Sequence, residues 1–534
     1  MMSASDTPPM TQDAVQGMTL GQLMGALAPA ALAEVVVRDL SLDSRAVTPG
    51  ALFLAVPGAR EHGLRHAAEA AEAGARLIAW EPGDGLGTPR LPAGCEAFPV
   101  PGLRARLGEI ADRFFGEPSK RVPVVGITGT NGKTSCAHLV AGALQALGRR
   151  AGIIGTLGAG PADNLRPSGL TTPDVVEVHR HLATLAGLGM RAVAMEVSSH
   201  ALAQHRVDGV RYAVAAFTNL SRDHLDYHPT LEAYAESKAR LFLEHAPAVS
   251  VINAADPCGR TLLRRLPADA RRIVVLREQA SDPLSDQASE PATETGREAA
   301  EVAELAAGTP TVLLRGVSSL EDGLALQLAG DFGEFELRSR LLGEFNADNL
   351  ALAFGILVAL DIAPAEAARA LAEAPPPPGR MEAFRDPGRE VLAVVDYAHT
   401  PDALAKALAA LRAHCRGRLW CVFGCGGDRD RGKRPEMARI AEQLADELVI
   451  TDDNPRGEDG VAIVTDILAG LEDPGRARVE RDRAAAVRHA LAGARPGDAV
   501  LVAGKGHEQV QIVGAEQRPF SDRALVAELT GSAP

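Results

Sequence analysis

The stretch GITGTNGKTS, residues 126–135, decides how the rest of the chain is interpreted. It directly follows the apolar run VPVV, so a glycine-rich turn and a Lys-Thr pair come where a strand ends and a helix begins. Backbone N–H groups and a helix N-terminus in this order form a cradle for phosphate. The usual phosphate-loop spacing, however, requires glycine at 127, and that position is Ile127. The sequence therefore predicts a variant phosphate loop; the alternative is a tight strand-to-helix turn.

Length and charge limit the class of protein. At roughly 150 residues per domain, the 534 residues predict about three domains. The excess of 69 acidic over 55 basic residues, a net charge of −14, argues against a nucleic-acid partner but allows a local basic site for a small anion. No apolar run approaches the roughly 20 residues of a membrane span, so no membrane insertion is expected.

The cysteines and the first residues bear on location. The cysteines include no CxxC pair, which predicts reduced thiols and a cytoplasmic protein. Residues 1–16 have neither a basic start nor an apolar core, so no signal peptide is expected.

Strand-like runs that alternate with helical stretches predict an α/β fold with three domains. We expect a first domain at 1–117, a central domain with a P-loop-type, mostly parallel sheet at 118–376, and a C-terminal domain with a Rossmann-like, doubly wound sheet at 377–534. APPPPGR, at 374–380, indicates a stiff connector between the last two domains. The polar stretch 279–306, poor in aromatic residues, predicts a flexible surface insertion.

Polar residues follow the strands of the predicted central sheet. Glu196 ends the apolar run RAVAME, where its carboxylate could hold Mg²⁺ opposite Thr134 or simply face water. In NLSRDHLDYH, His224 and His228 stand four residues apart, but leucine follows His224, so the HExxH zinc pattern is absent and a polar loop is the alternative. Lys238 lies in YAESKARLF, whose pattern is that of an ordinary amphipathic helix with an exposed lysine.

TGTNGKT resembles the ATP loop of the Mur ligases and the folylpolyglutamate synthases, enzymes that join an amino acid to a carboxylate. This resemblance implies an ATP-dependent ligase with Mg²⁺ as cofactor. It implies catalytic roles for Lys133, Lys238, Glu196 and His224, and a metal site of Thr134, Glu196, His224 and Lys238. In the Mur ligases the lysine, here Lys238, carries a carbamate derived from CO₂. A carbamate forms only on a neutral amine, so burial near the metal would have to lower the pKa of Lys238.

The same resemblance implies nucleotide and acceptor contacts. GEFNADN is similar to the family's adenine-side segment, and GRME and DYAHTP supply further nucleotide contacts. LSLDSRAVTPGALFLAVPG, residues 40–58, resembles the uridine-binding domain of the third ligase in the family's pathway, although a strand followed by a loop would also account for it. The implied ATP contacts are Gly129, Thr130, Asn131, Gly132, Lys133, Thr134, Ser135, Asn346, Arg380 and Asp396. The implied acceptor contacts are Leu42, Ser44, Thr171, Thr172, Ser198, Gln204 and Arg206.

Residues after strands of the C-terminal sheet predict the amino-acid substrate. DNPR, residues 453–456, is by itself a common turn with a capping aspartate, but the planar guanidinium of Arg456 matches a carboxylate. Meso-diaminopimelate differs from lysine by one carboxylate, so this arginine favours diaminopimelate. GCGGDRDRGKRP, 424–435, places a further arginine nearby, and GKGHE, 504–508, supplies a carboxylate for an ammonium group. The expected contacts are Arg434, Asp453, Asn454, Pro455, Arg456, Gly504 and Glu508.

Together these expectations describe a monomeric amide ligase. It would add meso-2,6-diaminopimelate to a UDP-linked muramoyl dipeptide, UDP-N-acetylmuramoyl-L-alanyl-D-glutamate, through an acyl phosphate, in peptidoglycan precursor synthesis. One alternative is a lysine-adding Mur ligase; another is a folylpolyglutamate synthase-like ligase, which needs neither a uridine domain nor DNPR. A non-catalytic, nucleotide-regulated binding protein would need neither the magnesium carboxylate nor the carbamate lysine.

Overall fold

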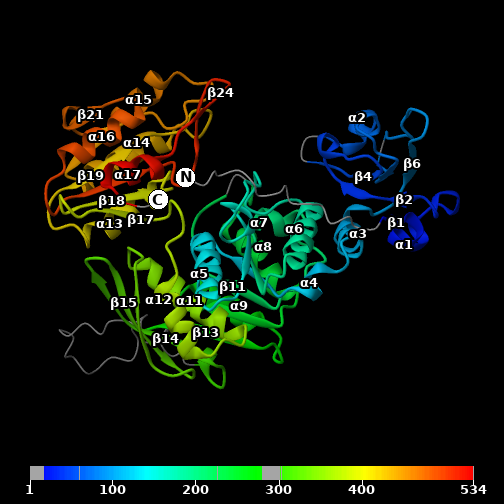
Figure 1. Ribbon diagram of the computed structural model, residues 1–534, viewed down its shortest axis with the longest axis horizontal. Helices are drawn as coiled ribbons and strands as arrows, with labels where there is room; N and C mark the ends of the chain where they lie inside the picture. Colours follow the sequence, from blue (N-terminus) through cyan, green and yellow to red (C-terminus); the bar gives the residue numbers. More distant parts are fainter. Residues whose placement is uncertain are drawn as a thin grey trace, which may run out of the picture. The chain divides into compact units, whose positions relative to one another are not determined.

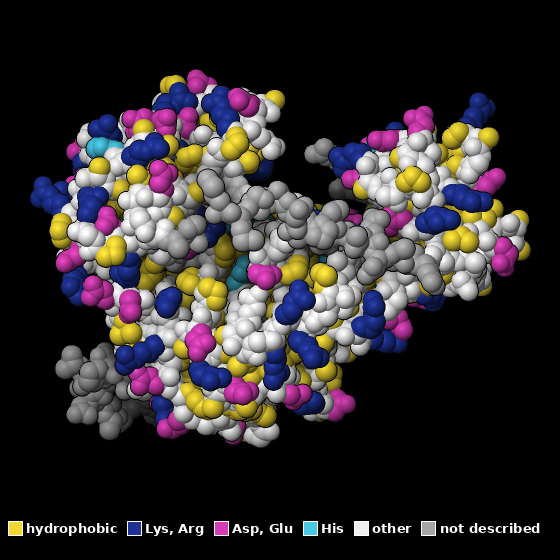
Figure 2. Space-filling model, viewed as in Figure 1, with side chains coloured by type: hydrophobic (Ala, Val, Ile, Leu, Met, Phe, Trp, Pro, Cys, Tyr) yellow, Lys and Arg dark blue, Asp and Glu magenta, His cyan; other side chains and the backbone are white. Residues whose placement is uncertain are grey.

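The computed structural model describes residues 17–58, 61–83, 85–224, 227–278, 301 and 304–532 (Figure 1). Most of the insertion predicted at 279–306 lies outside these residues. None of the described helices has the length and apolar character that a bilayer crossing requires. On the face drawn in Figure 2, basic side chains are interspersed with acidic ones over the described surface.

The described residues fall into two compact units. The first comprises the chain up to Lys133, Gly148–Ser250 and Arg264–Arg271. The second comprises Thr134–Leu147, Val251–Leu263 and the chain from Arg272 onward.

The N-terminal sheet is parallel, in the order β3-β4-β5-β6. Every residue of β4 is buried because alternate side chains enter two cores: Leu52 and Leu54 pack on one face, Phe53 and Ala55 on the other. Helix α3 covers the first of these faces. The elements are β3 (Asp39–Ser41), β4 (Ala51–Ala55), β5 (Leu77–Trp80), β6 (Glu96–Pro99), α2 (Ala67–Glu72) and α3 (Leu107–Phe114).

The central sheet has the order β16-β15-β14-β13-β12-β11-β7-β10-β8-β9. In the first unit β11, β7, β10 and β8 are parallel, and β9 returns antiparallel to β8. In the second unit β13 and β14 are parallel, whereas β15 and β16 are added antiparallel. The strands are β7 (Val124–Thr128), β8 (Ala151–Gly155), β9 (Gly158–Pro161), β10 (Ala192–Glu196), β11 (Val214–Phe217), β12 (Val249–Asn253), β13 (Arg272–Arg277), β14 (Thr311–Leu320), β15 (Gly323–Gly330) and β16 (Phe335–Ser339).

Every residue of β7, β8 and β10 is buried, as is typical of parallel strands covered on both faces. These strands therefore read as continuous apolar runs rather than as an alternating pattern. The helices that connect the strands are α5 (Lys133–Ala146), α6 (Val175–Gly187), α7 (Ser199–Ala203), α8 (Leu231–Leu243), α9 (Pro257–Arg265), α11 (Phe345–Ala359) and α12 (Pro364–Glu373).

The C-terminal sheet has the order β17-β18-β22-β19-β20-β21, and its strands are parallel except β17. Leu392 and Val394 of β18 pack with α13, α14 and α15, while Ala393 and Val395 pack with α16 and α17. The sheet is therefore covered on both faces. The elements are β17 (Glu382–Asp386), β18 (Val391–Asp396), α13 (Pro401–Arg412), β19 (Leu419–Phe423), α14 (Lys433–Leu444), β20 (Glu447–Ile450), α15 (Gly460–Leu468), β21 (Ala477–Val479), α16 (Arg483–Gly493), β22 (Ala499–Ala503), β23 (Val510–Val513), β24 (Glu516–Pro519) and α17 (Asp522–Thr530).

The predicted fold class is confirmed: three sheets with their helices follow one another along the described chain, and the last is doubly wound. The central sheet is more mixed than expected because β9, β15 and β16 add antiparallel edges to a parallel centre. The domain boundaries at 117 and 376 remain predictions. In such sheets ligands bind beyond the carboxyl ends of the parallel strands, and the predicted site residues follow those ends.

Candidate functional site

The phosphate loop begins two residues after the position where the usual spacing would place glycine. Ile127 is an interior residue of β7 with no exposed surface. The backbone turns at Gly129, whose φ of 144° is unfavourable for other residues. A Cβ atom there would lie 1.8 Å from the Thr218 hydroxyl. The loop therefore needs glycine at 129, whereas position 127 belongs to the strand.

Hydrogen bonds from the segment after β11 hold the loop. The Thr130 N–H donates to the Asn219 carbonyl at 2.8 Å, and the Asn131 N–H donates to the Asn219 side chain at 3.0 Å. The Thr218 hydroxyl donates to the Asn131 carbonyl at 2.6 Å, and the Ser221 N–H donates to the Thr130 hydroxyl at 2.9 Å. These bonds give the loop one defined shape.

Two lysines share one acceptor in this loop. Lys133 donates to the Gly129 carbonyl at 2.9 Å and to the Thr130 carbonyl at 2.8 Å. Lys238, on α8, donates to the same Gly129 oxygen at 2.8 Å. Its side chain is buried, and its nitrogen lies 4.3 Å from the centre of the Tyr234 ring. Lys238 is therefore not the exposed lysine that the amphipathic pattern of its helix would predict.

His224 also lies near Tyr234. Its ring is 6.2 Å from the Tyr234 ring and 4.8 Å from that of His200. Burial raises the pKa of Tyr234 to about 12, so the phenol stays neutral. His228 is buried, with its ring 5.2 Å from Tyr234. The part of the chain that the structure describes contains no group of three or more His, Cys, Asp or Glu side chains that could hold a metal ion.

Glu196 is a buried carboxylate at the end of β10, beside Ile127 of β7 in the strand register. One of its oxygens accepts from the Thr156 N–H at 2.9 Å and the other from the Thr156 hydroxyl at 3.0 Å. The hydroxyl of Thr156 also lies 3.0 Å from that of Thr171. A predicted metal ligand and a predicted acceptor contact thus meet at Thr156.

The remaining acceptor contacts of the central domain continue this network. The Thr172 hydroxyl donates to the Glu196 carbonyl at 2.8 Å and accepts from the Ser198 N–H at 3.1 Å. Arg206 donates to the Thr172 carbonyl at 3.0 Å and to the Gln204 side chain at 3.0 Å through Nε. Burial lowers the pKa of Arg206 despite the opposing charge of a neighbouring aspartate. Thr172 and Arg206, which are 34 positions apart in the sequence, therefore belong to one hydrogen-bonded group.

Leu42 and Ser44 lie in the turn at the carboxyl end of β3. The Ser44 hydroxyl donates to the Glu69 carboxylate at 2.8 Å. Leu42 is half-buried against the core that includes α3. The turn presents both residues at the edge of the sheet where ligands of parallel sheets bind.

The predicted nucleotide contacts of the second unit are mostly engaged with backbone. Asn346 is buried, and its amide donates to the Leu342 carbonyl at 2.8 Å. The two carboxylate oxygens of Asp396 accept from the N–H groups of Met381 and Ala398 at 2.7 and 2.8 Å. Burial raises the pKa of Asp396, although Arg380 and these amides oppose the shift.

Two histidines beside Arg380 escaped the sequence analysis. The Arg380 guanidinium lies 4.7 Å above the Tyr397 ring, and the His507 ring is 5.2 Å from the same ring. Burial, with the Arg380 charge, lowers the pKa of His507 and of His138 on α5 to about 4. Both rings are therefore neutral at physiological pH. The sequence could have indicated His507, because it lies within GKGHE, a segment already assigned to the site. No motif in the sequence marks His138.

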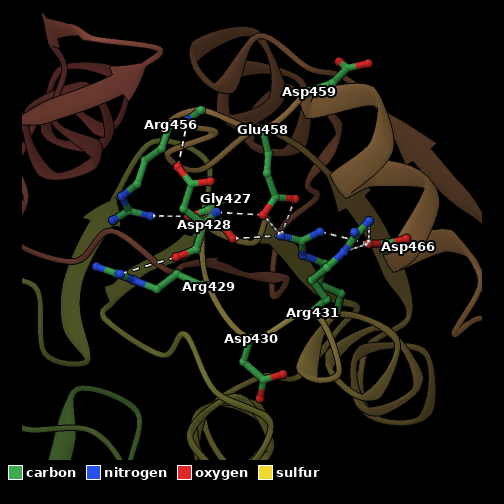
Figure 3. Close-up of polar contacts among 12 residues, drawn as sticks. Gly427, Asp428, Arg429, Asp430, Arg431, Arg456, Glu458, Asp459 and Asp466 are labelled. Atoms are coloured by element: carbon green, nitrogen blue, oxygen red, sulfur yellow. Dashed lines mark hydrogen bonds and ion pairs between the residues drawn. The ribbon is translucent and has the colours of Figure 1, made fainter.

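Four arginines of the C-terminal domain differ in their partners (Figure 3). Arg434 has no exposed surface and binds Asp466 and Glu458, both at 2.9 Å. Arg431 also binds Asp466, at 3.1 Å. Arg456 instead donates to the Gly427 carbonyl at 3.0 Å, and Arg429 donates to the carbonyl of Asp428, the residue directly before it, at 3.4 Å. Figure 3 shows the Arg456 and Arg429 guanidinium groups on the same side of this loop.

The segments DNPR and GKGHE are joined by buried polar groups. The Asn454 amide donates to Glu508 Oε2 at 2.8 Å, and Lys505 donates to the same oxygen at 2.7 Å. Gly504 has a φ of 116°, and a Cβ atom there would lie 2.6 Å from Asp453. Burial raises the pKa of Asp453. Burial also acts to raise the pKa of Glu508, but Lys505 and Asn454 outweigh it and lower that pKa.

Comparison with known families places these residues in context. A family profile described as "Mur ligase family, catalytic domain" matches residues 36–115, "Mur ligase middle domain" matches 127–357, and "Mur ligase, glutamate ligase domain" matches 379–506. The UDP-N-acetylmuramoyl-L-alanyl-D-glutamate–2,6-diaminopimelate ligase of Xanthomonas campestris pv. campestris (strain 8004) is 46% identical over 513 residues, which cover 96% of this chain and 97% of that protein.

Solved structures share the fold. One described as UDP-N-acetylmuramoyl-L-alanyl-D-glutamate–2,6-diaminopimelate ligase is 33% identical, with a TM-score of 0.67 and coverage of 96% of this chain and 99% of that chain. A folylpolyglutamate synthase from Mycobacterium tuberculosis is 19% identical, with a TM-score of 0.53 and coverage of 80% and 95%. The second likeness concerns the fold alone.

The partners of Arg434 predict its effect on stability. Arg434→Met should lower the melting temperature by roughly 5 °C or more, because two carboxylates would lose the cation buried between them. Arg431→Met removes an exposed guanidinium from the same Asp466 and should lower it by less than about 2 °C. Circular dichroism melts of both variants make the comparison, and equal losses would contradict the structural role of Arg434.

Proposed function

The chain belongs to the Mur ligase family, and from this premise we propose that it adds meso-2,6-diaminopimelate to UDP-N-acetylmuramoyl-L-alanyl-D-glutamate, with ATP, in peptidoglycan precursor synthesis. The 46% identity to a diaminopimelate ligase extends over both chains almost completely. The uridine-domain segment and the amino-acid loops are therefore included in the match. The choice among amino acids depends on the C-terminal domain.

The observation that carries this proposal is the pair of guanidinium groups at Arg456 and Arg429. Within the described residues neither forms an ion pair, whereas Arg431 and Arg434 both bind carboxylates of the protein. A guanidinium without an internal carboxylate is available to an anionic ligand, and its planar fork matches a carboxylate. We assign the carboxylate that distinguishes diaminopimelate from lysine to Arg456 and Arg429. Arg434, which the sequence analysis expected to contact the substrate, instead supports their loop.

Glu508 supplies the opposite charge. Its Oε2 accepts two hydrogen bonds from the protein, while no donor in the described part of the chain reaches Oε1. An ionised carboxylate with one oxygen available suits the ammonium group of an amino acid. Both diaminopimelate and lysine carry such a group, so this contact does not separate them. Only Arg456 and Arg429 argue against the lysine-adding alternative, because they are assigned to the carboxylate that lysine lacks.

The acceptor and the nucleotide would bind at the central domain. We assign the acceptor's peptide to the group that joins Thr171, Thr172, Ser198 and Arg206, and its uridine end to the turn with Ser44. The phosphate loop, Asn346, Arg380 and Asp396 are assigned to ATP. Lys133 binds two loop carbonyls, and on binding ATP it would exchange them for phosphate oxygens.

Thr134, Glu196, His224 and Lys238 are the residues that would hold magnesium. The donor set fits a hard cation, because Glu196 is a buried carboxylate and a carbamate on Lys238 would add further oxygens. Burial and the second ammonium group on the Gly129 oxygen both disfavour a charged amine at Lys238, as carbamate formation requires. Bound Mg²⁺ would neutralise charge that develops on the transferring phosphate.

The reaction needs no protein nucleophile. The acceptor carboxylate of the D-glutamate residue attacks the γ-phosphate of ATP, an O–P bond forms, and ADP leaves. The amine of diaminopimelate then attacks the acyl carbon, loses a proton, and phosphate leaves. The protein positions the reactants and stabilises charge. Lys133 serves the phosphates, while Arg456, Arg429 and Glu508 orient the amino acid.

The net charge and the cysteines bear on the partners of the enzyme and on the compartment in which it acts. The net charge of −14 and the mixed surface charge on the face in Figure 2 argue against a nucleic-acid partner. None of the six cysteines, all of which lie in the described part of the chain, forms a disulfide, which suits a reducing cytoplasm where ATP is available. We expect the enzyme to act as a monomer.

ADP release tests the proposed function. With the UDP-linked dipeptide, ATP and Mg²⁺, turnover should require diaminopimelate, and lysine should replace it poorly. Folate with glutamate should support no turnover. ADP release that depends on folate and glutamate would establish the synthase alternative, and none with any acceptor would favour the binding protein.

Arg456→Ala should raise the KM for diaminopimelate about ten- to hundredfold, because a charge-assisted hydrogen bond contributes roughly 1.5–3 kcal/mol. The KM values for ATP and the dipeptide should barely change, and the poor use of lysine should stay as it is. Arg431→Ala, in the neighbouring loop, is the control and should retain the wild-type preference. If Arg456→Ala still prefers diaminopimelate by the wild-type margin, the carboxylate binds elsewhere.

Lys238→Ala should lose most activity, and acetate or formate should partly restore it by supplying carboxylate oxygens in the same place. Carbon-13 NMR with labelled bicarbonate should show a carbamate signal in the wild type that is missing in Lys238→Ala. Lys120→Ala, an exposed control on another helix, should keep both the signal and the activity. A fully active Lys238→Ala variant would contradict the carbamate.

A further inference from the structure

Lys505 is a buried cation that the proposed mechanism does not use. It follows β22 and Gly504 and has no exposed surface. Its ammonium group donates to the Asn454 side-chain oxygen at 3.0 Å and to Glu508 Oε2 at 2.7 Å. A buried ammonium group is costly unless it is paired and hydrogen-bonded, so these two contacts account for its place in the fold.

The contacts of Lys505 determine how Glu508 is presented. Oε2 of Glu508 accepts from both Lys505 and the Asn454 amide, which fixes the rotation of the carboxylate. Asn454 is held in turn, because its side-chain oxygen also accepts from the Ile512 N–H at 2.9 Å. The second oxygen, Oε1, is left for the ligand.

We propose that Lys505 is a positioning residue for diaminopimelate, which orients Glu508 and keeps it ionised without touching the substrate. This inference rests on the proposed function, since it assigns Glu508 to the ammonium group of the amino acid. Lys505 would also couple the two amino-acid loops, because it binds one residue of each.

The charges around Glu508 predict how diaminopimelate binding should depend on pH. Lys505 and Arg483 act in favour of the ionised Glu508 carboxylate, while the carboxylate of Asp453 acts against it; His507 and the Tyr397 hydroxyl, also near Glu508, are both neutral at physiological pH. Burial raises the pKa of Glu508, and the hydrogen bond and charge of Lys505 are the largest opposing influences. Loss of Lys505 should therefore raise this pKa. Since only ionised Glu508 binds an ammonium group, diaminopimelate binding should then fail at a higher pH on the acid side.

Other hydrogen bonds hold the DNPR segment and should preserve the fold without Lys505. The Gln511 amide donates to the Asp453 carbonyl at 2.9 Å, and the Arg456 N–H donates to the Ile512 carbonyl at 3.0 Å. Methionine matches the length of the lysine stem and leaves no unpaired charge in the buried space. Lys505→Met should therefore alter Glu508 more than it alters the backbone.

The experiment measures kcat and the KM for diaminopimelate against pH in the wild type, Lys505→Met, Glu508→Gln and the double variant. Lys505→Met should raise this KM roughly tenfold and move the acid limb upward by about one pH unit, with the KM for ATP unchanged. In the Glu508→Gln background, Lys505→Met should have little further effect, because the two residues act as a unit. Lys406→Met, at an exposed ion pair on α13, is the control and should match the wild type.

Three results would overturn the proposal. They are an unchanged acid limb in Lys505→Met, additive effects in the double variant, or equal increases in the KM values for ATP and diaminopimelate. If circular dichroism shows that Lys505→Met does not fold, Lys505→Gln neutralises the same position while keeping an N–H donor. Failure of the wild type to use diaminopimelate would refute the proposed function instead, so the two failures are distinguishable.

Discussion

The close approach of Gly129 to the segment after β11 is the constraint on which the nucleotide side of the structure depends. No side chain fits at position 129, because a Cβ would lie 1.8 Å from the Thr218 hydroxyl, and the backbone there has a φ of 144°. This geometry directs the Gly129 carbonyl toward Lys133 and Lys238, which both donate to it. One backbone conformation thus brings together Lys133, which we assign to the phosphates, and Lys238, the buried lysine that we propose to carry the carbamate. The strand register then brings Glu196 alongside, since it pairs with Ile127 of the adjacent strand.

On the amino-acid side, the protein uses most of its buried charges to support one another. Arg434 and Lys505 are buried completely and are paired with carboxylates. Internal pairing of this kind fixes loops, because breaking it leaves an uncompensated charge in a poorly solvated place. The groups that remain outside these pairs are the ones that we assign to the amino-acid substrate: the guanidinium groups of Arg456 and Arg429 and one oxygen of Glu508.

Much of the fold could be predicted from the sequence because its signals are local. Buried parallel strands appear as continuous apolar runs, and glycine positions mark the turn after β7. The site residues were harder to predict from the sequence. Lys238 has the sequence surroundings of an exposed helical lysine, and only family resemblance singled it out. Arg434, on α14, and Arg429, in the loop before it, stand five positions apart, and the sequence cannot tell which of them binds Asp466 and Glu458. His138 reaches the neighbourhood of Arg380 only through tertiary packing.

The scaffold and the choice of substrate are physically separable in this protein. Parallel strands β18, β22, β19 and β20 deliver their following loops to one edge of the sheet whatever those loops contain. A folylpolyglutamate synthase shares this fold at 19% identity, so the arrangement of strands alone does not select the amino acid. In the proposed function, selection of the amino acid requires that Arg456 and Arg429 at that edge form no ion pair within the protein while neighbouring arginines are paired with carboxylates. We therefore propose that discrimination between diaminopimelate and lysine depends on Asp466 and Glu458 as well as on Arg456, because these two carboxylates bind Arg434 and leave Arg456 and Arg429 for the ligand.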